Sequence, residues 1–96
     1  MSFEIRYSSE SVKQLESLRA FDSAAIIAEI ENVLMVNPTL VSKARVKKLR
    51  QPAPTEYRLR VGDFRVFYDV DAADRVVNVI QILSKDDAIA FLKGNP

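Results

Sequence analysis

Two alternating segments joined by a glycine turn constrain this chain more than any other feature. Apolar and polar residues alternate through Tyr57–Val61 and again through Phe64–Val70. A period of two indicates half-buried β-strands. The intervening Gly62-Asp63 fits a tight type II′ turn, which takes glycine at its first central position. The sequence therefore predicts an antiparallel hairpin.

One face of this hairpin is expected to be cationic. Arg58 and Arg60 share a face of the first strand, and Arg65 shares a face of the second strand with Phe67. Folding about the turn can bring the three arginines together. Guanidinium forks bind phosphate in bidentate fashion, and aromatic rings stack on nucleobases. The hairpin thus suggests a phosphate-and-base site. A solvated arginine face with Phe67 in the core remains the alternative.

The flanking segments predict an α+β fold. The expected elements are a strand at 2–7, a helix at about 9–20, a helix from Asp22 or Ser23 to about Val36, strands at Arg45–Leu49 and Val76–Leu83, and a last helix at Ser84–Lys93. Consecutive hairpins make a mainly antiparallel sheet. We expect one domain over 1–96, with two N-terminal helices packed on a twisted, mainly antiparallel sheet and a short C-terminal helix.

Composition excludes several classes of site. The chain has 96 residues, enough for one domain, and contains neither cysteine nor histidine. Disulfide scaffolds, zinc sites and the common nucleophile–base pairs are therefore excluded, and neither a metal nor another cofactor is predicted. There is no signal-peptide pattern at the N-terminus and no apolar run of membrane-spanning length. A cytoplasmic location without membrane association is expected.

Charge is concentrated in one part of the chain. The formal net charge is only +1, yet residues 43–65 carry eight cations against two anions, a net +6, and the remainder carries −5. The eight are Lys43, Arg45, Lys47, Lys48, Arg50, Arg58, Arg60 and Arg65. Such an imbalance favours a localised anion-binding surface, with a solvated charged face as the alternative.

A family resemblance runs through this basic region. The run EYRLRVGDFRVFYDVD, followed by the strand VVNVIQIL and a short terminal helix, resembles the RelE/ParE superfamily of bacterial toxins. The upstream run Lys47-Lys48-Leu49-Arg50 fits as well, so the resemblance covers nearly the whole chain. It implies the toxin of a toxin–antitoxin module, with a cognate antitoxin as partner.

The resemblance to RelE-like members implies a ribosome-dependent endoribonuclease with the ribosome and mRNA as partners. In such toxins a ribose 2′-hydroxyl attacks the adjacent phosphate, which requires charge stabilisation, a base and an acid. The catalytic residues implied by position are Arg58, Arg60, Arg65 and Lys85. The RNA-binding residues implied are Lys47, Lys48, Arg50 and Phe67.

Departures from the RelE-like pattern keep other functions open. Where such members have a tyrosine or histidine near the start of the last helix, this chain has Ile89. Guanidinium is a poor general base, and Lys85 or Tyr68 could serve only with a lowered pKa. The alternatives are a ParE-like inhibitor of DNA gyrase without enzymatic activity, and a degenerate toxin that only binds its antitoxin.

Overall fold

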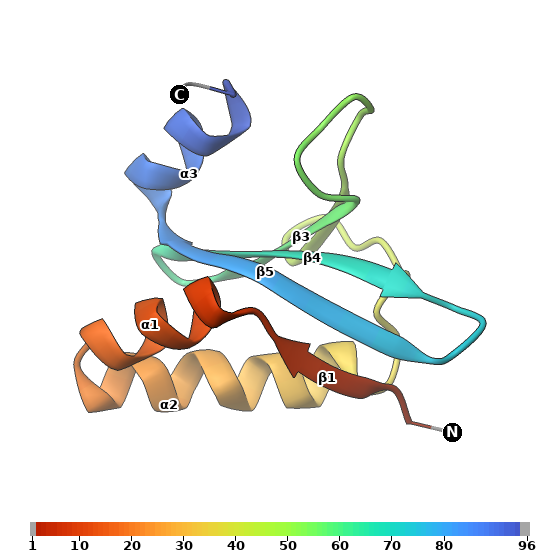
Figure 1. The fold of residues 1–96 in the computed structure, drawn as a ribbon, viewed down its shortest axis with the longest axis horizontal. Coiled ribbons are helices and arrows are strands. Elements are labelled where there is room, and N and C mark those ends of the chain that lie inside the picture. The colour runs from red at the N-terminus through yellow and green to blue at the C-terminus, as the bar shows by residue number, and fades with distance from the viewer. Residues whose placement is uncertain (1, 95–96) are drawn as a thin grey trace.

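Five strands form one sheet in the order β1-β5-β4-β3-β2, in a computed structural model that describes residues 2–94 (Figure 1). The elements in chain order are β1 (Glu4–Tyr7), α1 (Ser9–Ser17), α2 (Ala20–Glu29), the π-helical segment η1 (Ile30–Leu34), β2 (Val46–Lys48), β3 (Tyr57–Val61), β4 (Phe64–Asp71), β5 (Val76–Ser84) and α3 (Lys85–Leu92). The α+β class is confirmed.

The sheet is mainly antiparallel, as predicted. Each of β2, β3 and β4 pairs antiparallel with the strand that follows it, whereas β1 pairs parallel with β5. Strand β5 is therefore an interior strand with a neighbour on both sides. Its almost continuous apolar sequence suits that place, because Val77, Val79 and Ile82 are buried in the main core and Leu83 packs with Phe67 and Ala88 in a second, smaller cluster.

The main core lies between the sheet and the two N-terminal helices, which cover one face (Figure 1). Ile26 of α2 and Ile30 and Leu34 of η1 are fully buried. They form one cluster with Leu59 and Val66 of the sheet. Full burial of such side chains contributes about 1.5–3 kcal/mol each. Within residues 2–94, no helix has the length and apolar character needed to cross a bilayer.

The second helix begins earlier than predicted. It starts at Ala20, and neither Asp22 nor Ser23 caps it. Asp22 instead pairs with Arg19 at 3.3 Å, and the Ser23 hydroxyl donates to the Leu15 carbonyl at 2.6 Å. Both side chains therefore make other interactions, and N-cap propensities, which describe single residues, could not predict them.

The remaining boundaries differ from expectation by a few residues. The first helix ends at Ser17 and β2 is limited to Val46–Lys48. The predicted cap of the last helix is confirmed, because the Ser84 hydroxyl accepts the Asp87 N–H at 3.2 Å. The positive φ of Gly62, +56°, agrees with a type II′ turn.

Candidate nucleic-acid interface

The register of three strands gathers the cations on the face opposite α1 and α2. Lys47 of β2 lies directly opposite Arg58 of β3, and Arg60 of β3 lies directly opposite Arg65 of β4. Directly opposed residues of antiparallel strands project from the same face. The prediction that the three arginines share a surface is confirmed. We refer to the surface made by Lys47, Arg58, Arg60 and Arg65 as the cationic face.

This arrangement costs folding stability. Like charges directly opposite each other in neighbouring strands repel, and Arg60 and Arg65 form such a pair. Within residues 2–94, the ion pairs involve Arg6, Arg19 and Arg45, so no carboxylate neutralises the arginines of the cationic face. A repulsive cluster of this kind suits an external polyanion.

Arg58 is the most constrained member of the cationic face. Its side chain is half-buried, and its Nε atom is buried without a hydrogen-bond partner among the described residues. Burial lowers the pKa of Arg58, and the nearby charges of Arg65 and Arg60 lower it further. The guanidinium still remains protonated at neutral pH. Arg58 is therefore a partly desolvated charge whose donors an anion could satisfy.

The Gly62-Asp63 turn orders the other end of the cationic face. Arg65 folds back over it, and one terminal nitrogen of its guanidinium donates to the carbonyls of Gly62 and Phe64, both at 2.9 Å. The backbone N–H of Lys85, the first residue of α3, donates to the Asp63 carbonyl at 2.8 Å. The turn thus brings the predicted catalytic Lys85 close to the strand that carries Arg65.

Phe67 is not available to stack on a base, so this prediction is wrong for the structure described. It lies on the expected face but is fully buried. Leu49 and Ala88 pack against it, and its ring meets the ring of Phe91 edge-on, with centroids 4.9 Å apart. Strand alternation assigns Phe67 to a face without showing that α3 and the segment after β2 cover that part of the face. In the sequence, the apolar residues Ala88 and Phe91 of the last helix were the feature that could have indicated this covering.

Tyr68 cannot serve as a base. It is fully buried on the helix-covered face, where its ring stacks on Tyr57 with centroids 5.4 Å apart. Its hydroxyl donates to the Pro38 carbonyl at 2.6 Å. Burial, with a smaller contribution from Tyr57, raises the pKa of Tyr68 far above its ordinary value, the opposite of what a base needs.

The remaining predicted residues are exposed and scattered. Lys48 pairs with Tyr57, so the strand register places it away from the cationic face. Arg50 lies in the loop after β2, and Ile89 on α3 is 51% exposed. The RNA-binding and catalytic roles assigned from sequence stay predictions.

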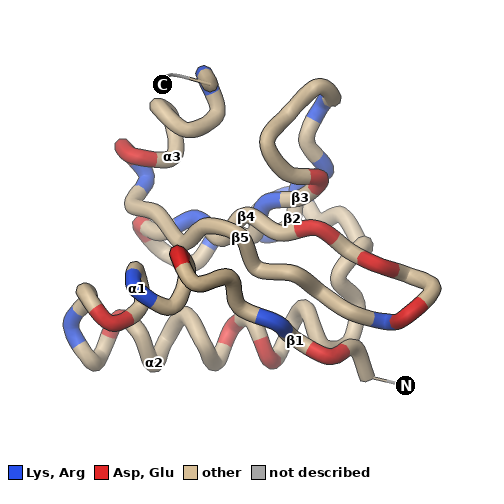
Figure 2. The backbone as a smooth tube through the Cα atoms, viewed as in Figure 1, with Lys and Arg blue, Asp and Glu red and all other residues tan. Residues whose placement is uncertain are grey.

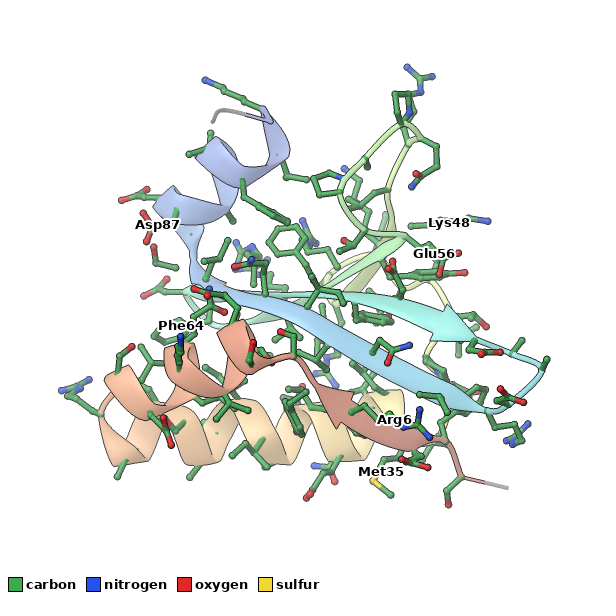
Figure 3. All side chains as sticks on the ribbon, viewed as in Figure 1. Arg6, Met35, Lys48, Glu56, Phe64 and Asp87 are labelled. Carbon is green, nitrogen blue, oxygen red and sulfur yellow. The ribbon has the colours of Figure 1, made fainter. Side chains whose placement is uncertain are left out.

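Charge changes sign along the cationic side of the sheet. Figure 3 shows Glu56 further along the sheet from Phe64, the first residue of β4. The Glu56 carboxylate accepts the Val70 N–H at 2.8 Å, and the Asp69 carboxylate accepts the Glu56 N–H at 2.7 Å. Further Asp residues follow along the β4–β5 hairpin (Figure 2). In the described part of the chain, no acidic side chains cluster closely enough to hold a metal ion.

Comparison with known proteins identifies the family. A family model described as the ParE toxin of type II toxin–antitoxin system, parDE, matches residues 5–89. The chain therefore belongs to this family of toxins, within the RelE/ParE superfamily. No protein with a curated functional description matches the chain.

Several solved structures have the same fold. The RelE–RelB complex from the archaeon Pyrococcus horikoshii is 28% identical, has a TM-score of 0.72, and matches over 88% of this chain and 97% of that one. The Mycobacterium tuberculosis toxin–antitoxin complex RelBE2 is 22% identical, with a TM-score of 0.72 over 88% and 99% of the two chains. A mutant of Escherichia coli RelE in the free state is 17% identical, with a TM-score of 0.72 over 98% and 97%. The last two comparisons establish the fold alone.

Proposed function

We propose that this toxin inhibits translation by binding mRNA in the ribosome through the cationic face and cleaving its phosphodiester backbone. The observation that carries the proposal is the Arg60–Arg65 pair, two arginines directly opposite each other in the strand register, neither of which pairs with a carboxylate among the described residues. Adjacent guanidiniums match the oxygens of a phosphate group. A bound RNA phosphate would attract both arginines and so offset their mutual repulsion.

The proposed roles follow from charge. When the 2′-hydroxyl attacks, the phosphorus centre gains negative charge, and preformed cations stabilise it most strongly where water is partly excluded. Arg58 is half-buried and Arg65 is held over the turn, so both are preorganised. Arg60 is exposed and completes the cluster. Lys85 would donate the proton to the leaving 5′-oxygen.

The test is cleavage of mRNA by purified toxin during in vitro translation, with the new RNA ends mapped. Arg60→Ala should lower the cleavage rate by roughly 10²–10³-fold, the usual effect of removing one charge-stabilising donor. Arg60 is exposed, so the variant should remain folded. Arg19→Ala removes an exposed arginine at the junction of α1 and α2 and should cleave normally. Equal activity of the two variants would refute the proposal.

A second candidate is a ParE-like inhibitor of DNA gyrase. Two observations favour it: the family model that matches, and the distribution of phenols. Tyr7, Tyr57 and Tyr68 all pack with the core on the helix-covered side, so among the described residues no phenol borders the arginines. Inhibition of gyrase supercoiling by the toxin, with mRNA left intact, would favour this candidate.

We further propose that a cognate antitoxin neutralises the chain, as RelB is bound to RelE in the Pyrococcus complex. An acidic, amphipathic segment that folds on binding would complement the cationic face and the exposed apolar residues of α3, Ile89 and Leu92. A short acidic reading frame beside the gene would support this. The toxin would act in the cytoplasm, where its ribosomal target lies.

A further inference from the structure

The proposed cleavage contains one step that arginine cannot perform. A proton must leave the attacking 2′-hydroxyl, and its acceptor must be able to exist without a proton. Guanidinium does not meet this requirement. The chain has no histidine or cysteine, and Tyr68 is buried on the other face with its hydroxyl already donating to Pro38. Beyond the Glu56 carboxylate, which already accepts the Val70 N–H at 2.8 Å, an amine is the remaining chemistry on this side of the sheet.

Lys47 supplies that amine. It is the middle residue of β2, its side chain is exposed, and its register partner across the sheet is Arg58. The charged groups around it are the guanidiniums of Arg58 in the same row and of Arg60 in the next row. In the opposite direction along the chain, Glu56 directly precedes β3, and its carboxylate accepts the Val70 N–H.

We propose that Lys47 is the proton acceptor for the 2′-hydroxyl, an inference that rests on the proposed RNA cleavage. The reaction displaces the 5′-oxygen in line, so acceptor and donor must stand on opposite sides of the phosphorus. Lys47 lies on β2 and Lys85 directly follows β5, while the arginines lie on β3 and β4 between them. Three strand spacings, about 14 Å, separate the two main chains across the sheet, and Lys85 lies four residues, about 13 Å, further along than Gln81, which shares the row of Lys47. Both long lysine side chains can therefore reach inward toward a phosphate bound by the arginines.

The proposed step balances without a further reactant. The 2′-oxygen forms a bond to phosphorus, and the bond from phosphorus to the 5′-oxygen breaks. The 2′-hydroxyl proton passes to Nζ of Lys47 when that amine is in its unprotonated form, and the ammonium of Lys85 gives a proton to the departing 5′-oxygen. The products are a 2′,3′-cyclic phosphate and a 5′-hydroxyl. Both lysines then exchange protons with solvent.

Conservative substitution separates proton transfer from binding. Lys47→Arg keeps the positive charge but removes the ability to accept a proton. In single-turnover assays on ribosomes programmed with a defined mRNA, it should bind within about twofold of the wild type and cleave roughly 10²–10⁴-fold more slowly, the usual contribution of a general base. The rise of the wild-type rate with pH should also disappear. The matched control is Lys13→Arg on α1, an exposed lysine on the helix-covered side.

The outcomes distinguish the two proposals. Cleavage by the wild type and Lys13→Arg with loss in Lys47→Arg supports Lys47 as the acceptor. Equal cleavage by Lys47→Arg and the wild type overturns the role of Lys47 and leaves the proposed function intact. A wild-type protein that binds the programmed ribosome but leaves the mRNA uncut overturns the proposed function, and the role of Lys47 with it. Circular dichroism melting would verify that each variant is folded.

Discussion

Phe91 is the residue whose removal should most clearly release α3 from the sheet. The helix is short, and its contact with the sheet consists of the buried Ala88 and the half-buried Phe91, which packs edge-on against Phe67. A fully buried Phe→Ala change costs about 3–5 kcal/mol. Because Phe91 is only half-buried, we expect Phe91→Ala to cost about 2 kcal/mol of docking free energy, including the aromatic contact.

Native-state hydrogen exchange would measure this effect. A loss of about 2 kcal/mol corresponds to roughly 30-fold faster exchange, and it should be confined to the amides of α3, since isolated helices of this length are marginal. The amides of β5 should keep their protection, because β1 and β4 flank that strand. Ile89→Ala, at an exposed position of the same helix, is the matched control and should change exchange less than threefold. Unchanged exchange of α3 in Phe91→Ala would refute this account of how the helix is held.

Three further predictions concern the core, the salt dependence and the antitoxin. Tyr68→Phe should lower the free energy of unfolding by about 1–3 kcal/mol at neutral pH, because the buried Pro38 carbonyl loses its donor, while activity per folded molecule stays unchanged. Because burial raises the pKa of Tyr68 in the folded state, the stability linked to its neutral hydroxyl is fully present below the ordinary tyrosine pKa of about 10. This stability is lost as the pH rises above that value, by up to about 1.4 kcal/mol per pH unit. Denaturant melts of Tyr68→Phe should therefore show a smaller alkaline loss of stability than melts of the wild type. RNA or ribosome binding should weaken with a log–log salt slope of about −2 to −4, for roughly 3–5 phosphate contacts, and salt-independent binding would exclude the cationic face as the contact surface. Residues 84–96, of which 95 and 96 lie outside the described residues, should be the most rapidly exchanging structured part of the free chain, and their amides should gain protection when the antitoxin binds. Strong protection of 84–94 in the free chain, unchanged on binding, would instead indicate that the antitoxin acts only by covering the arginines.

Movement of α3 away from the sheet would change the surface next to the cationic face. Phe67 lies in the same row of the sheet as Arg58, so undocking of the helix would uncover an aromatic ring beside the most constrained arginine. The stacking role predicted from sequence fails in the structure described because Phe91 occupies the space above the ring. Loss of α3 contacts and exposure of Phe67 are therefore expected to occur together.

The local pattern alone determined the hairpin and its cations. Alternation around Gly62 defined two strands, their turn type and the common face of Arg58, Arg60 and Arg65, because these properties depend only on the period of a strand and the geometry of a two-residue turn. The cap at Ser84 was predictable for the same reason, since its hydrogen bond spans three residues.

Packing between distant segments decided the rest. Alternation divides side chains between two faces, but it does not say which parts of a face other elements will cover. The burial of Phe67 depends on Phe91, which lies far along the chain, and the exclusion of Tyr68 as a base depends on the carbonyl of Pro38. The place of Lys47 beside Arg58 likewise depends on the pairing of β2 with β3 across the 49–56 loop. These contacts join residues that no local period relates, so only the tertiary structure could establish them.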